Sequence, residues 1–110
     1  MILCEYLVGV GGNNVPTIIL NGQAGYIGDD LVLGRCDLIT RMGRVDLIIE
    51  LVDEDGTPCE WVSLVALPKN VTELLEAGTV IGVIDGVREL GVANPVRGVE
   101  LDNGVVNYAT

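Results

Sequence analysis

Hydrophobic and polar residues alternate most regularly in the middle of the chain. Three runs follow this two-residue period, Leu31–Thr40, Val45–Val52 and Cys59–Leu67, and short segments rich in turn-forming residues separate them. The pattern predicts a three-stranded antiparallel meander. One face of its middle strand is entirely apolar and should point into the core: Val45, Leu47, Ile49 and Leu51.

The opposite face of this middle strand has mixed polarity, because Asp46 and Glu50 alternate there with Ile48 and Val52. Such a face is typical of a sheet surface that another sheet or another subunit partly covers. The third strand carries the single tryptophan, Trp61. Since a ring of this size is most often buried, we expect it to anchor the core, with an interface as the alternative.

Shorter apolar runs on both sides of the meander predict further strands. Residues 2–10 alternate in polarity and should form a first strand, which a glycine- and asparagine-rich loop would end. Four more strands are predicted at Thr17–Leu20, Thr79–Ile84, Val96–Leu101 and Val105–Ala109. Turns are expected at Asn21-Gly22, Asp85-Gly86 and Asn103-Gly104, and the last would close a C-terminal hairpin.

One short segment has the signals of a helix. Asn70 followed by Glu73 fits the pairing of an N-cap residue with a residue three positions later, and Gly78 fits a left-handed C-terminal position. These signals predict about two turns of helix from Val71 to Ala77.

Composition favours strands nearly everywhere else. The chain holds 17 Val, 9 Ile and 6 Thr against 5 Ala, and 15 Gly interrupt it at short intervals. A chain of 110 residues is the size of one domain. We therefore predict an all-β fold, a small single-domain β-barrel or β-sandwich over residues 1–110, with one short helix near residues 71–77.

The net charge of −10 argues against several partners. Sixteen acidic residues face six basic ones, so the chain as a whole would repel nucleic-acid phosphates and anionic membrane surfaces. We expect no direct nucleic-acid binding and no membrane association. The start of the chain lacks the basic residues of a signal peptide, so we expect a reducing cytoplasmic location or an assembled particle rather than secretion.

The sequence offers few residues that could carry out catalysis or bind a cofactor or metal ion. Histidine is absent, and the single serine, Ser63, and single lysine, Lys69, have no sequence context that would activate them. Glycines 9, 11 and 12 lack the last glycine and the following helix of a phosphate-binding loop. The acidic run Asp53–Asp55 lacks the ligand spacing of a calcium loop and fits a hairpin turn. We predict no catalytic residue, no cofactor-binding residue and no metal ligand.

Three cysteines cannot all pair within one chain, and their spacing is not that of a zinc or thioredoxin-like site. Cys4, Cys36 and Cys59 lie in apolar strand contexts, where burial would raise the thiol pKa. We expect all three to be reduced core residues.

The function these observations favour is a non-enzymatic one. A chain with few catalytic residue types, apolar ends and roughly half of its residues apolar offers surfaces for packing. We expect a structural subunit of a homo-oligomeric assembly that contacts itself and other structural proteins. A virion or phage component, such as a capsid decoration or tail/adaptor protein, is the most concrete form. The alternative is an acidic intracellular binding protein or inhibitor that occupies the basic surface of a nucleic-acid-binding partner.

Overall fold

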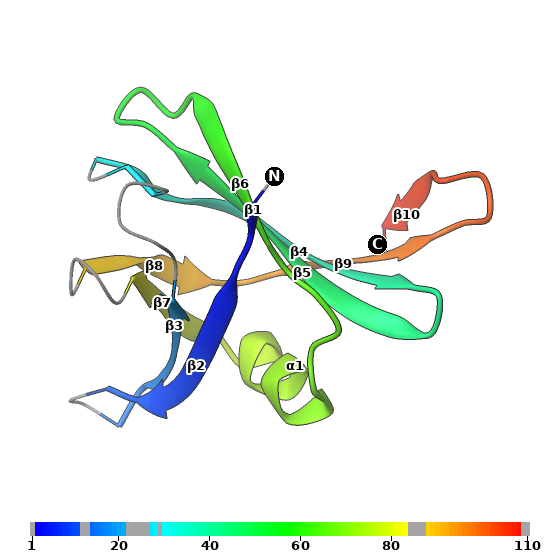
Figure 1. The fold of residues 1–110 in the computed structure, drawn as a ribbon, viewed down its shortest axis with the longest axis horizontal. Helices are drawn as coiled ribbons and strands as arrows, with labels where there is room; N and C mark the ends of the chain where they lie inside the picture. The colour runs from blue at the N-terminus through cyan, green and yellow to red at the C-terminus, as the bar shows by residue number, and fades with distance from the viewer. Residues whose placement is uncertain (1, 12–13, 22–26, 29, 84–87, 109–110) are drawn as a thin grey trace.

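Two mixed β-sheets and one short helix make up the fold, which is not closed into a barrel (Figure 1). The computed structural model describes residues 2–11, 14–21, 27–28, 30–83 and 88–108. The six-stranded sheet has the order β1 (Ile2–Leu3), β6 (Pro58–Leu64), β5 (Arg44–Val52), β4 (Val32–Arg41), β9 (Val96–Glu100) and β10 (Val106–Tyr108). The four-stranded sheet has the order β2 (Glu5–Val10), β3 (Pro16–Asn21), β7 (Thr79–Val83) and β8 (Arg88–Ala93).

The predicted meander is confirmed as β4, β5 and β6, which pair antiparallel in this order. Met42 and Gly43 join β4 to β5 with φ angles of 49° and 77°, and two positive φ angles in succession are typical of tight hairpin turns that follow the twist of the strands. On β5, Leu47, Ile49 and Leu51 are fully buried, as the alternation predicts.

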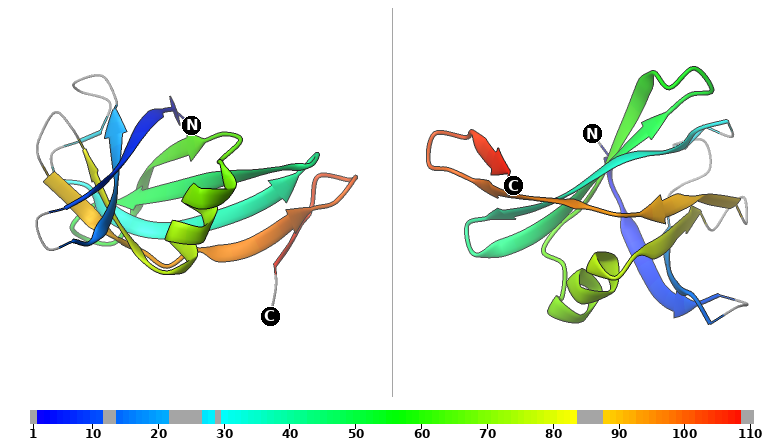
Figure 2. Two further views of the ribbon diagram at one scale, coloured as in Figure 1. Left: turned by 90° about the horizontal axis from the view of Figure 1, so that it is seen from below. Right: turned by 180° about the vertical axis from the view of Figure 1, so that it is seen from behind.

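Two very short connections, of one and two residues, carry the chain from a strand of one sheet into a strand of the other. The predicted single strand over residues 2–10 is divided at Cys4 into β1, in the six-stranded sheet, and β2, in the four-stranded sheet. On the far side of the molecule, β8 continues through residues 94–95 into β9, and Figure 2 shows this ribbon running across both sheets. The sheets are therefore joined covalently at both of these crossings.

The hydrophobic core lies between the two sheets and the helix. Ile18 and Leu20 enter it from the four-stranded sheet, and Leu47 and Leu64 enter it from the six-stranded sheet, all with no exposed surface. Leu75 of the helix packs in the same cluster. At about 25 cal/mol per Å² of apolar surface, this burial is the main stabilising contribution to the fold.

The helix α1 spans Lys69–Glu76, two residues earlier at its start than the pattern indicates. The prediction of Asn70 as the N-cap is wrong, because Pro68 occupies that position and makes no side-chain cap. The carbonyl of Pro68 instead accepts hydrogen bonds from the backbone N–H groups of Val71 and Thr72. Gly78 follows the helix with a φ of 89°, as its predicted left-handed role requires.

The remaining strand predictions are confirmed with small shifts in their bounds, as β3, β7, β9 and β10. The hairpin of β9 and β10 closes over residues 102–104, and Gly104 has a φ of 83°. The expected turns at Asn21-Gly22 and Asp85-Gly86 fall wholly or partly outside the described residues. Strand β8 was not predicted, because Arg88–Ala93 contains two charged residues and a glycine and shows no regular alternation.

Candidate functional site: an open strand edge

The most prominent surface feature is the edge strand β2 at the border of the four-stranded sheet. All six of its residues pair with β3, from Glu5 with Asn21 to Val10 with Pro16. Its other edge pairs with no strand in the part of the chain that the structure describes. Three apolar residues are exposed along it: Leu7 by 53%, Val8 by 42% and Val10 by 70%. A strand edge of this length and polarity can add a further strand.

The outer face of the same sheet extends this apolar surface. Leu7 lies opposite Ile19 on β3, and Val80 on β7 lies opposite Val92 on β8. Val92 is 57% exposed, whereas Ile18, which alternates with Ile19, is buried in the core. We call β2 and this face, with Leu7, Ile19, Val80 and Val92, the open-edge surface.

The outer face of the six-stranded sheet carries Trp61, so the prediction that this residue anchors the core is wrong. Trp61 lies opposite Glu50 and is 40% exposed. Val62 and Leu64 are buried toward the other sheet, so alternation turns Trp61 outward. Leu3, which pairs with Ser63, is 75% exposed. This face therefore carries exposed apolar side chains as well.

The C-terminal hairpin packs onto part of this outer face. The hydroxyl group of Tyr108 donates a hydrogen bond to Oδ2 of Asp37 over 3.0 Å, and the guanidinium of Arg35 lies 5.1 Å from the centre of the Tyr108 ring. Ile39 is only 2% exposed, although it lies on the outer face. Gly98 permits this packing: a Cβ atom there would lie 2.7 Å from Cγ1 of Val106 and 3.1 Å from Cδ1 of Ile39.

A buried carboxylate lies near the start of β5. Asp46 is 1% exposed, and its Oδ1 atom accepts a hydrogen bond from the backbone N–H of Ala66 over 2.8 Å. The Nε atom of Arg44 is 3.3 Å from Oδ1, and that of Arg41 is 3.6 Å from Oδ2. Arg41 also forms an ion pair with Glu100 of β9 over 2.9 Å. This cluster connects β4, β5, β9 and the segment after β6, so we assign it a structural role.

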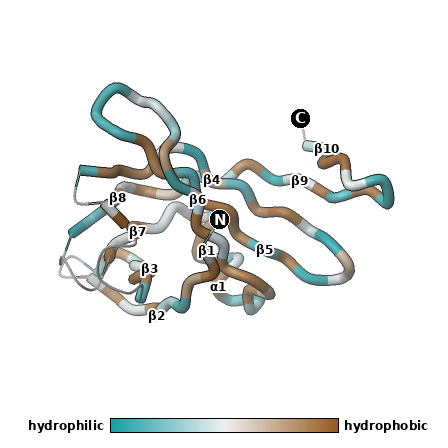
Figure 3. The backbone as a smooth tube through the Cα atoms, turned by 45° about the horizontal axis from the view of Figure 1, so that its top comes forward, coloured by the Kyte–Doolittle hydropathy of each residue, from teal (hydrophilic) through white to brown (hydrophobic). Residues whose placement is uncertain are grey.

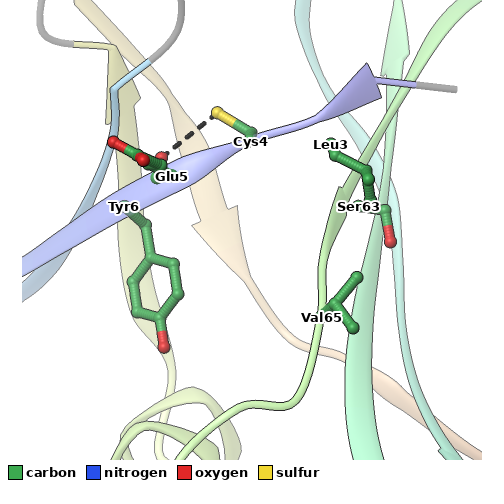
Figure 4. Close-up of a pocket in the computed structure, with 6 residues that line it drawn as sticks. All are labelled: Leu3, Cys4, Glu5, Tyr6, Ser63 and Val65. Carbon is green, nitrogen blue, oxygen red and sulfur yellow. Dashed lines mark hydrogen bonds between the residues drawn. The ribbon is translucent and has the colours of Figure 1, made fainter.

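A hollow of about 420 Å³ opens where β1 passes into β2, between that crossing and β6 (Figure 4). Cys4, Tyr6, Ser63 and Val65 are among its lining residues. Burial raises the pKa of the Cys4 thiol, with a smaller contribution from Glu5, and burial also raises the pKa of Tyr6. Both groups are therefore neutral near pH 7, and the hollow offers no activated nucleophile.

The cysteines follow the expectation in part. All three are free thiols, and Cys36 is buried, with its pKa raised to about 12 by burial and secondarily by Asp37. Cys4 is half-buried. The prediction of Cys59 as a core residue is wrong, because it lies on the exposed face of β6 close to the turn at Asp53.

The acidic run after β5 forms a tight turn. Oδ1 of Asp53 accepts hydrogen bonds from the backbone N–H groups of Asp55 and Thr57, each over 2.9 Å, so this carboxylate serves the turn itself. Among the described residues, no group of three or more histidine, cysteine, aspartate or glutamate side chains is placed to hold a metal ion. Gly9 and Gly11 lie in and directly after β2, and Gly12 is outside the described residues.

Comparisons of the chain with protein-family models, curated proteins and solved structures give no match. In the described part of the chain, no helix has the length and apolar character needed to span a membrane. The surfaces themselves therefore provide the basis for a functional proposal.

Proposed function

We propose that the protein is a non-catalytic structural subunit of a homo-oligomeric assembly and that the open-edge surface is its contact with a second copy. A component of a virion or phage particle, such as a capsid decoration or tail/adaptor protein, is the most concrete form of this role. Such a subunit would also contact other structural proteins of the particle.

The observation that carries the proposal is the edge strand β2. Natural proteins protect long edge strands with charged residues, prolines, bulges or a covering element, because unpaired N–H and C=O groups recruit other strands. β2 has a single charged residue, Glu5, at its first position, and then presents Leu7, Val8 and Val10 to solvent. Pairing with another copy would satisfy the backbone groups and cover these side chains.

Leu7→Lys tests the proposal with little risk to folding, since Leu7 is more than half exposed. A lysine there should shift the protein toward monomer in sedimentation velocity at tens of micromolar. Val99→Lys is the matched control: Val99 is 50% exposed, but it lies on β9, which is paired on both sides. A monomeric wild-type protein, or equal effects of the two variants, would refute the proposal.

One observation favours the acidic binding protein as a second candidate. Four of the five arginines form ion pairs with carboxylates, and Arg88 donates hydrogen bonds to the carbonyl oxygens of Leu31 and Gly28. Most acidic side chains in the described part of the chain therefore have no basic partner within the protein. A monomer that binds a cationic peptide at low salt and releases it at high salt would support this candidate over the first.

A further inference from the structure

A second hollow, of about 410 Å³, lies where β5 begins, beside the first turn of α1. It collects three of the six basic residues of the chain, Arg44, Lys69 and Arg97, around apolar Val45 and Leu67. These cations come from three separate elements, β5, α1 and β9. We call this feature the basic hollow.

The lining of the basic hollow contains three cations and no carboxylate, although the protein as a whole is acidic. Arg44 shares Asp46 with Arg41, and Arg97 forms an ion pair with Glu76. Arg41 also pairs with Glu100. Lys69 has no ion-pair partner among the described residues. With Glu73, one helical turn from Lys69, four cations meet four carboxylates around the hollow, so this end is close to neutral in a chain whose net charge is −10.

The opposite end of β5 is strongly acidic. The turn Asp53–Gly56 follows Val52 directly, and the carboxylates of Glu54 and Asp55 are exposed and form no ion pair within the described residues. The hydrogen bonds that Asp53 accepts from the backbone hold the turn in one shape. Figure 3 shows both ends of β5 as hydrophilic segments on either side of a hydrophobic strand.

We propose that the basic hollow binds the Asp53–Gly56 turn of a second copy, so that subunits associate head to tail along the direction of β5. The nine residues of this strand separate the two ends by about 30 Å, at roughly 3.3 Å per residue. At physiological salt, charges interact over about 8 Å. The charges close to a contact therefore affect association more than the net charge of the whole subunit does. Because the two surfaces differ, the contact is heterologous and generates a ring or a filament.

This inference rests on the proposed self-association and adds a second contact to it. The open-edge surface is apolar and should hold at high salt, whereas contact between the basic hollow and the acidic turn should weaken as salt rises. General repulsion between acidic subunits has the opposite sign, because salt screens it and favours association. The salt dependence of the assembly size therefore separates the two effects.

The test uses two complementary variants of the full chain in sedimentation velocity at low and high salt. Glu54→Lys combined with Asp55→Lys reverses the charge of the two exposed side chains of the turn. Lys69→Glu reverses the charge of the one cation in the hollow that has no ion-pair partner among the described residues. Each alone should weaken the salt-sensitive association about tenfold or more. Their mixture should restore it, since the basic turn then meets an acidified hollow and the acidic turn meets an intact one; this restoration also requires both variants to be folded.

Glu89→Lys with Asp102→Lys is the matched control, because both residues are exposed outside the two ends and the change in net charge is the same. This control should keep the salt-sensitive association of the wild type. Equal loss in the control, no restoration in the mixture, or wild-type association that grows with salt would overturn the inference. Binding of inorganic phosphate to the wild type, abolished by Lys69→Glu while assembly size stays unchanged, would also overturn it by assigning the hollow to a small anion.

The possible results distinguish the open-edge contact from the head-to-tail contact. A salt-independent oligomer that Leu7→Lys dissociates and the charge reversals leave intact would retain the open-edge contact and refute the head-to-tail contact. A wild-type monomer at every salt concentration would refute both.

Discussion

Replacement of Asp46 should destabilise the protein far more than its place on the outer face of a sheet suggests. Asp46→Ala removes the acceptor for the backbone N–H of Ala66, whose φ of 55° is an unfavourable conformation for a residue with a side chain. It also leaves Arg41 and Arg44 without their shared carboxylate. The segment that connects β6 to α1 would then lose its hydrogen bond to Asp46 and keep the one from the N–H of Leu67 to the carbonyl of Val45 on β5.

The expected loss can be worked out from these contacts. A hydrogen bond to a charged acceptor, such as the part-buried one from the N–H of Ala66 to Asp46, contributes about 1.5–3 kcal/mol. Ion pairs with partly exposed arginines, whose side chains are 30% and 47% exposed, contribute about 0.2–1 kcal/mol each. Asp46→Ala should therefore lower the free energy of unfolding by about 2–5 kcal/mol. For a chain of this size that corresponds to a decrease in Tm of about 8–20 °C.

Asp46→Asn separates the two contributions, because its amide oxygen can still accept the hydrogen bond from Ala66. This variant should lose only about 1 kcal/mol, or about 4 °C in Tm. Thermal and urea unfolding followed by circular dichroism measure both values, and Asp102→Ala in the exposed turn serves as the control. Equal Tm values for the Ala and Asn variants, or an Ala variant as stable as the wild type, would refute the reasoning.

Three further predictions concern the hairpin and the thiols. Gly98→Val should destabilise by about 1–3 kcal/mol in urea unfolding, since its side chain would displace the hairpin from the sheet; unchanged stability would contradict that packing. The hydrogen bond to Asp37 raises the pKa of Tyr108, so its stabilising contribution is complete below the ordinary value of 10.0 and is lost as pH rises through the folded-state value. Thermal melts in alkaline buffer should thus show a smaller decline for Tyr108→Phe than for the wild type, and identical declines would count against the bond. A thiol reagent should label exposed Cys59 in the native protein and buried Cys36 only after unfolding, as mass spectrometry of digested samples can show; native labelling of Cys36 would place it outside the core.

The alternation of hydrophobic and polar residues was sufficient to predict the meander, because β4, β5 and β6 are neighbours in both sequence and space. The division of residues 2–10 at Cys4 was not predictable in this way, because β1 pairs with residues 62–63, far along the chain. Strand β8 was missed for a different reason, because its own sequence shows no regular alternation. Its pairing with β7, around a bulge and Gly91 at a φ of 147°, compensates for weak local strand propensity.

The surface features were predictable to different degrees. Alternation places Trp61 and Ser63 on one face of β6, but it does not show which face packs against the second sheet. The burial of Asp46 depends on the bend at Ala66, which has no signature in the sequence. The basic hollow was equally hidden, because Arg44, Lys69 and Arg97 are widely spaced along the chain and only the fold brings them together.

The parallel pairings of the two sheets also determine the order in which the chain can fold during its synthesis. β2 and β3 can form their hairpin as soon as residue 21 has emerged from the ribosome, but β3 must wait for β7 and β1 for β6, some sixty residues later. In that interval Ile18 and Leu20, which the finished protein buries completely, have no core to enter. Nascent chains that are translated close together on one mRNA would then expose the same unpaired hairpin to one another. Slow translation through residues 22–78 should therefore increase co-translational aggregation.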